Sequence, residues 1–186
     1  MKKIYLFLTV LGMGVAIAGA GARASDVNML LWAVHSNKPE VLRALIAEGA
    51  DVNATEKKSG GTALMMAAQN GYIDIARLLI EKGADVNAKT PKEGWTALMS
   101  AVQNDRLEIV RLLIEARVDV NAVDKNGQMA LMKLSGDNYI EIANLLIKAG
   151  ANVNATDSKG ATVLMYAKAK RYAKIVQLLQ DAGARE

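Results

Sequence analysis

The sequence contains no cysteine and only one histidine, His35, among its 186 residues. Without cysteine the chain can form no disulfide bond and can carry no lipoprotein anchor, so a hydrophobic core alone must hold the fold together. The single histidine provides no cluster of metal ligands, and a lone histidine on a helix is more often a surface or packing residue than a catalyst. Cysteine and paired histidines, which serve many enzymes as nucleophiles, bases or metal ligands, are therefore missing.

Sequence motifs of catalysis and cofactor binding are missing as well. No glycine-rich loop follows a predicted strand, as phosphate binding requires, and no H-E-x-x-H sequence or cysteine–histidine cluster indicates zinc. We therefore predict that the protein is not an enzyme and uses no cofactor. The alternatives are an enzyme whose site the sequence does not reveal, or a metal carrier.

The first 24 residues have the composition of a secretory signal peptide. Lys2 and Lys3 form a basic start, and the apolar run that follows is shorter than the roughly 20 residues of a membrane span. The small residues Ala22 and Ala24 predict cleavage after Ala24; the alternative is an uncleaved anchor. We expect one domain over residues 25–186, located in a bacterial periplasm or outside the cell.

The charge of the remaining chain is nearly balanced. Lys2, Lys3 and Arg23 lie in the predicted signal peptide, which contains no acidic residue, so the net charge of +4 says little about partners. Lysines and acids are interspersed, and no platform combines aromatic with basic residues, so we expect no nucleic-acid partner. Because no long apolar run follows the predicted signal peptide, we expect no membrane span in the mature chain.

A short sequence with a Val-Asn-Ala core recurs along the chain. Its asparagines, at spacings of 34, 34 and 33 residues, are Asn53, Asn87, Asn121 and Asn154. Two positions before them stand Asp51, Asp85, Asp119 and Asn152. Such a period is typical of stacked repeats, in which one unit cannot bury its apolar face without a neighbour of the same shape. Because an active site is normally built once, the recurring aspartates indicate loop hydrogen bonding rather than catalysis.

Each period also contains two apolar runs with helical spacing. The first runs begin near residues 28, 62, 96, 129 and 162, and a second run follows each of them directly. Polar stretches with glycine, such as TEKKSGG and KTPKEGW, join the units and have the composition of turns. We predict an all-α repeat solenoid of five helix-turn-helix pairs with short hairpin loops. The units cover about residues 26–54, 55–88, 89–122, 123–155 and 156–184.

The T-A-L-x-x-A opening, the L-L-I run and the closing G-A-D-V-N-A together resemble the ankyrin repeat over residues 26–184. The resemblance implies antiparallel helix pairs, a hairpin finger between pairs, and a curved stack with a protein-binding concave face. The sequence departs from the family in its opening, which lacks the proline and histidine of T-P-L-H. The glycine between paired helices survives only as Gly71. The other units carry Asn37, Asp105, Asn138 and Arg171 at that position.

The ends of the predicted helices follow known preferences. Hydroxyls that can cap the first helices belong to Thr62, Thr96 and Thr162. Glycines that can end the second helices in left-handed conformation are Gly49, Gly83, Gly150 and Gly183, whereas one unit has Arg117. One position of the second helices is occupied by Ile46, Ile80, Ile114, Ile147 and, in the last unit, Gln180. We therefore expect the first and last units to cap a complete array.

Methionine recurs at the fourth position of the opening, as Met65, Met99, Met132 and Met165. Thioethers bind Cu(I), but equivalent residues of adjacent units lie about 8–10 Å apart, too far to share one ion. We interpret the methionines as filling the space of the absent histidine. A copper site is the alternative.

The resemblance indicates which residues face a partner. They are Lys57, Lys58, Gln69, Asn70, Lys92, Trp95, Gln103, Asn104, Lys125 and Asp137. Trp95 has the profile of a rigid interface anchor, or else it packs on its own hairpin. The finger lysines favour an acidic partner or form a solvated rim. Trp32 and Tyr166 are expected at the edge of the core, with contact to a partner as the alternative.

We predict a monomeric, exported protein-interaction module that inhibits, protects or assists another exported protein with an acidic surface. The main alternative is an envelope scaffold that binds several partners weakly. The two differ in affinity and stoichiometry, which the sequence does not determine.

Overall fold

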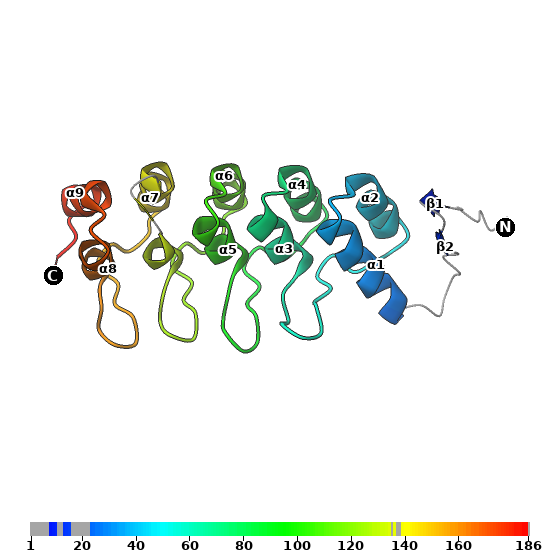
Figure 1. The fold of residues 1–186 in the computed structure, drawn as a ribbon, viewed down its shortest axis with the longest axis horizontal. Coiled ribbons are helices and arrows are strands. Elements are labelled where there is room, and N and C mark those ends of the chain that lie inside the picture. Colours follow the sequence, from blue (N-terminus) through cyan, green and yellow to red (C-terminus); the bar gives the residue numbers. More distant parts are fainter. Residues whose placement is uncertain (1–7, 11–12, 16–22, 135, 137–138, 186) are drawn as a thin grey trace.

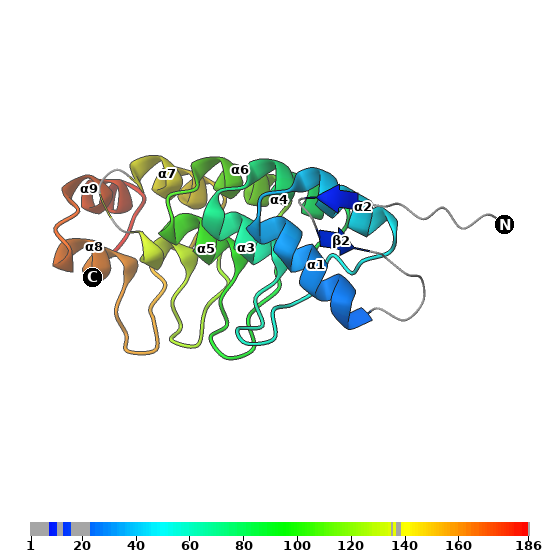
Figure 2. The same cartoon turned by 45° about the vertical axis from the view of Figure 1, so that its right-hand side comes forward.

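A computed structural model describes residues 8–10, 13–15, 23–134, 136 and 139–185. From residue 23 onward the chain forms a row of helix pairs, with loops that all project on one side (Figure 1). Seen from a second direction, the first helix of each pair lies between its second helix and the loops (Figure 2). The predicted all-α repeat solenoid is confirmed for this part of the chain.

The described residues contain five consecutive pairs of helices, which we call units 1 to 5. Unit 1 pairs α1 (Arg23–His35) with α2 (Pro39–Ala47), and unit 2 pairs α3 (Ala63–Asn70) with α4 (Ile73–Glu81). Unit 3 consists of α5 (Ala97–Gln103) and α6 (Leu107–Glu115). Unit 4 consists of a 3₁₀ helix, η1 (Ala130–Lys133), and α7 (Ile140–Lys148). Unit 5 consists of α8 (Val163–Ala169) and α9 (Ala173–Asp181).

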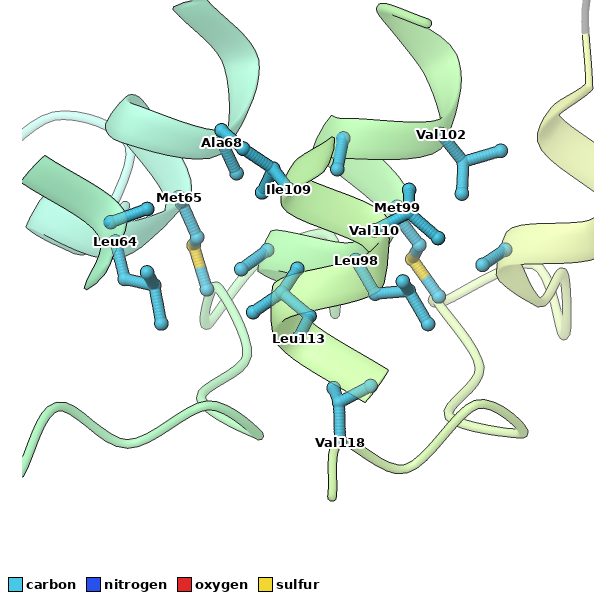
Figure 3. Close-up of a cluster of buried hydrophobic side chains, with 14 of the residues drawn as sticks. Leu64, Met65, Ala68, Leu98, Met99, Val102, Ile109, Val110, Leu113 and Val118 are labelled. Atoms are coloured by element: carbon cyan, nitrogen blue, oxygen red, sulfur yellow. The ribbon is translucent and has the colours of Figure 1, made fainter. Parts of the chain in front are cut away.

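One continuous core runs through the units, because the same positions are buried in each. In unit 3, Leu98, Ile109 and Leu113 are at most 1% exposed, and they belong to the same buried cluster as Leu64 and Ala68 of unit 2 (Figure 3). Burying such a side chain contributes about 1.5–3 kcal/mol, so the stack depends on contacts between neighbouring units. The isoleucines predicted at the unit interfaces pack against the core, whereas Gln180 in the last unit is exposed.

The predicted helix caps form as expected. The hydroxyls of Thr62, Thr96 and Thr162 accept hydrogen bonds from backbone N–H groups three residues later, at 3.1–3.2 Å. The glycines predicted to end the second helices all have positive φ, between 85° and 94°. Arg117 shares this left-handed conformation with φ 60°, which is costly for a residue with a side chain.

Unit 4 departs from the prediction. A full helix was expected from residue 129, but only η1 forms, and Leu134 has left the helical region with ψ 134°. Two local causes are visible. Met129 replaces the capping threonine and makes no side-chain cap, and Leu134 stands where Ala67 and Ala101 are completely buried. A leucine does not fit where the packing accepts only a methyl group, so the helix ends.

The recurring asparagines join each unit to the next. The backbone N–H of Asp85 donates to the side-chain oxygen of Asn53 at 2.8 Å, and that of Asp119 donates to Asn87 at 2.8 Å. The same bond links Asn152 to Asn121 and Arg185 to Asn154. Within each loop, the side chains of Asp51, Asp85, Asp119 and Asn152 accept from the backbone two residues later, at 2.9–3.0 Å. The predicted loop-bonding role of these aspartates is therefore confirmed.

The hairpin loops between units, which we call fingers, also contact one another. The N–H of Lys125 donates to the carbonyl of Glu93, and the N–H of Ser158 donates to that of Asn126, both at 2.8 Å. Gly127 permits the second approach, because a Cβ atom there would lie 2.8 Å from the Ser158 nitrogen. The fingers therefore form a continuous rim rather than independent loops.

Two short strands precede the helices, β1 (Leu8–Val10) and β2 (Met13–Val15), and pair antiparallel with each other. They fall within the predicted signal peptide. The predicted cleavage point lies in the first turn of α1, which begins at Arg23.

Candidate partner-binding site

A groove of about 390 Å³ lies between the fingers and the first helices of units 2 and 3. Met65 and Met66 of α3 and Trp95 supply its apolar lining. Its polar lining includes Gln69 and, at the end of α5, Gln103 and Asn104. The finger residues Glu56, Ser59, Lys92 and Glu93 line the opposite side. We call this feature the unit 2–3 groove.

The groove brings together half of the predicted binding residues. Those that line it are Gln69, Lys92, Trp95, Gln103 and Asn104. Lys57, Lys58, Asn70 and Lys125 are exposed but are not part of its lining. Asp137 lies outside the described residues. The predicted surface is therefore concentrated at one place along the stack rather than spread evenly over the units.

Trp95 packs on its own unit, as one of the two interpretations of its sequence position predicted. Its indole N–H donates to the hydroxyl of Ser100 at 2.8 Å, and its backbone N–H donates to the hydroxyl of Thr90 at 2.9 Å. These bonds hold the half-buried ring against its own unit. The ring nevertheless lines the groove. Trp95 thus presents a fixed apolar surface, and its indole N–H requires no hydrogen-bond acceptor from a partner because Ser100 already provides one.

A polar network occupies the neighbouring units, and sequence reasoning missed it. The ammonium group of Lys133 contacts Asp124 Oδ2 at 2.7 Å and Gln128 Oε1 at 2.5 Å. The side-chain nitrogen of Gln128 donates to the hydroxyl of Tyr166, which donates to Asp157 Oδ2 at 2.7 Å. The sequence does contain a sign of this network. Ser100, Lys133 and Tyr166 occupy the same position in three successive repeats, so stacking places them on one face.

The network fixes the charges of its carboxylates. Burial opposes the charge of Asp124, but hydrogen bonds from Lys133 and from backbone N–H groups outweigh it and keep the pKa of Asp124 below its ordinary value. The hydroxyl of Tyr166 donates to Asp157 and lowers the pKa of that carboxyl. The same bond raises the pKa of Tyr166. Both aspartates are therefore ionised at neutral pH and engaged within the protein.

The amides beside the groove are differently placed. The side chains of Gln69 and Gln103 are exposed and form no hydrogen bond to any described residue. Asn70 and Asn104 each use their side-chain nitrogen to bond a carbonyl of their own helix, at 2.9 and 2.8 Å. Their side-chain oxygens have no donor within the described part of the chain. Units 2 and 3 thus keep amide groups that are available to a partner. In units 4 and 5, by contrast, the polar side chains of Gln128, Lys133 and Tyr166 are bonded within the protein.

The charged side chains of the fingers also differ in whether they have a partner within the protein. Glu56 is held by its own loop, where the hydroxyl of Ser59 donates to it at 2.6 Å and lowers its pKa. Glu93 forms an ion pair with Lys125 of the next finger. Across residues 23–134 and the later described ranges, no carboxylate forms a close ion pair with Lys57, Lys58 or Lys92, although the charge of Lys58 contributes to lowering the pKa of Glu56. Glu56 stays ionised but is outnumbered by Lys57, Lys58 and Lys92, so the two fingers beside the groove carry a net positive charge.

The remaining candidates behave as packing or surface groups. Met65, Met99 and Met132 are at most 5% exposed, and the Met65 sulfur accepts the N–H of Thr62 at 3.5 Å. These three methionines therefore fill the core beside the caps, as interpreted from the sequence, whereas Met165 in the last unit is 48% exposed and departs from that interpretation. His35 is exposed. Among the described residues, no group of three or more histidine, aspartate or glutamate side chains is placed to hold a metal ion.

Comparison with known proteins agrees with this geometry. A family model described as ankyrin repeats (3 copies) matches residues 30–124 and again residues 116–185. The chain belongs to the ankyrin-repeat family. Ankyrin repeats are generally protein–protein interaction modules and typically lack catalytic activity. A search of curated proteins found no significant match. No helix in the described ranges is long and apolar enough to cross a membrane.

Proposed function

We propose that this ankyrin-repeat protein is an exported, monomeric binding protein that engages another exported protein through the unit 2–3 groove. The observation that carries the proposal is the concentration of uncommitted amides, Lys92 and an apolar lining in one groove, with the exposed lysines Lys57 and Lys58 on the adjoining finger. A binding face requires such groups, because each one can form a new contact without breaking an internal one. Blocking or protecting a partner requires only this surface, so no catalytic group is needed.

Export is supported by the sequence of the first 24 residues, with its basic start, apolar run and small residues before Ser25. Cell fractionation followed by N-terminal sequencing tests this part of the proposal. We expect the protein in the periplasmic or secreted fraction with Ser25 as its first residue. Recovery from the cytoplasm, or from membranes with the N-terminus intact, would contradict export as a mature, soluble protein.

Affinity capture tests the binding role. The purified protein is immobilised and exposed to envelope extract from the source cell, and then compared with the double variant Gln69→Ala and Gln103→Ala. Both glutamines are exposed and make no internal side-chain bond, so the fold is expected to survive. The control replaces Arg77 and Lys82, exposed residues of the α4 region, by alanine.

We expect the native and control forms to capture one protein stoichiometrically. The groove variant should capture less of that protein. Equal capture by all three forms would mean that another face binds. Weak capture of several proteins would favour the envelope scaffold that the sequence left as the alternative.

A further inference from the structure

We propose that the unit 2–3 groove receives an extended acidic segment of the partner, with one large apolar side chain seated against Met66 and Trp95. This inference rests on the proposed function and names the chemistry of the segment that the groove recognises. Its elements are the boundary of the site, the apolar seat, the spacing of the amides and the sign of the rim charge.

The boundary is set by Lys133. Its ammonium group lies 4.7 Å from the centroid of the Trp95 ring. The Lys133 side chain is only 12% exposed. Beyond it, the groups of Asp124, Gln128, Tyr166 and Asp157 bond one another. A ligand gains little from groups that already have partners, since each new bond would replace an old one. The bound segment is therefore expected to lie along the face of units 2 and 3 and to end at Lys133.

The seat is apolar and of suitable size. Met66 and Trp95 are both half-buried and pack against the core, so their free surfaces are fixed before binding. Trp32 occupies the position equivalent to Met66 in unit 1 and is 43% exposed, which extends the apolar surface by one unit. A volume of about 390 Å³ accommodates one large side chain with its flanking backbone. A fixed aromatic surface of this kind is the usual anchor of an interface.

The amides favour an extended backbone over a helix. Gln69 and Gln103 occupy equivalent positions in adjacent units, and packed helices lie about 8–10 Å apart. An extended chain rises about 3.3 Å per residue, so neighbouring glutamines meet residues about three apart. A carboxamide offers both donors and an acceptor, which match the unpaired N–H and C=O groups of an extended segment. A helix has already paired those groups and would leave the glutamines unmatched.

The rim charge selects acidic residues. Lys57, Lys58 and Lys92 are exposed and form no close ion pair within the described residues, whereas the charge of Glu93 is offset by Lys125. Glu56 remains ionised but is outnumbered by these three lysines, so the fingers beside the groove attract an acidic ligand. Carboxylates on either side of the apolar residue would face these lysines, and the attraction would weaken with added salt.

The test uses peptides displayed on phage, with random sequences of about 12 residues that span about 40 Å when extended. The full protein is the target, and enriched peptides are synthesised and measured by fluorescence anisotropy. We expect enriched peptides to carry aspartate or glutamate around one aromatic or large aliphatic residue. Lys92→Glu should weaken binding by about tenfold or more. Lys159→Glu is the matched control, since Lys159 is an exposed finger residue beside the internally bonded units.

The proposal is overturned by enrichment of neutral or basic peptides, by equal effects of the two charge reversals, or by absence of any peptide sensitive to Lys92→Glu. Tighter binding of a single-stranded oligonucleotide than of any selected peptide would also overturn it. The broader binding function is judged separately. If affinity capture yields a stoichiometric partner that the acidic peptides do not displace, the occupant is wrong and the proposed function stands.

Discussion

The ammonium group of Lys133 lies over the ring of Trp95, 4.7 Å from its centroid, while it contacts Asp124 Oδ2 at 2.7 Å. The ammonium group of Lys133 thus forms a cation–π contact with a ring of unit 3 and an ion pair with a carboxylate of its own unit. The side chains of Lys133 and Asp124 are only 12% and 3% exposed. Water screens such a pair weakly, and removing one partner would leave the other charge buried and uncompensated, which costs more than breaking a surface ion pair.

Replacing Lys133 by methionine should destabilise the protein by about 3 kcal/mol, because Asp124 would remain buried without its cation. Urea unfolding measures the free energy. Asp124→Asn and the double variant complete a mutant cycle, and we expect the double variant to be more stable than the sum of the single effects predicts. Additive effects within about 0.5 kcal/mol would show that the two groups do not interact.

Stability should fall in acid through the same carboxylate. The pKa of Asp124 is lowered in the folded protein, so the unfolded chain binds a proton more readily. The stabilisation is therefore fully present above the unfolded pKa of about 3.9 and is lost as pH falls through the folded pKa. Free energies of unfolding measured from pH 6 downward should decrease less steeply in Asp124→Asn than in the native protein. Parallel curves would contradict the assignment.

The asparagine bonds between units should each contribute measurably. Asn87→Ala removes the acceptor of the Asp119 N–H, and we expect a loss of about 1 kcal/mol in the free energy of unfolding. Asn126→Ala is the control, because Asn126 is an exposed finger residue whose side chain bonds no described residue. A similar loss in both variants would assign the effect to the substitution rather than to the bond.

Arg117→Gly should raise the melting temperature by about 2–4 °C, because φ 60° costs an arginine about 1 kcal/mol that glycine avoids. Thermal unfolding followed by circular dichroism measures the shift. Arg111→Gly, in the middle of α6, should instead lower the melting temperature. An unchanged or lower value for Arg117→Gly would mean that this side chain makes a needed contact.

The sequence was informative wherever one chemical role repeats. The threonine caps, the left-handed positions and the buried isoleucines and leucines of the second helices follow from local preferences that hold in every unit. The recurring aspartates, with Asn152, were assigned to loop bonding for the same reason, whereas the bonds of the asparagines between units were not predicted. Half of the predicted binding residues then meet in one groove, because positions equivalent in sequence become adjacent when the units stack.

What the sequence did not reveal depends on side chains that occur once. Lys133 reads as an exposed helical lysine until the stack places it beside Trp95 and Asp124. Likewise, Leu134 suits an amphipathic helix, but the space available at its position is set by the neighbouring units. Both outcomes depend on packing between units, which no local pattern records.

The bond from each asparagine to the following unit uses a side-chain oxygen on one side and only a backbone N–H on the other. The receiving unit therefore needs no particular side chain to be accepted. As far as this bond is concerned, a unit could be duplicated, deleted or exchanged without a matching side chain at the new junction. The buried contacts between units and the Lys133–Trp95 contact set the remaining limits on such an exchange.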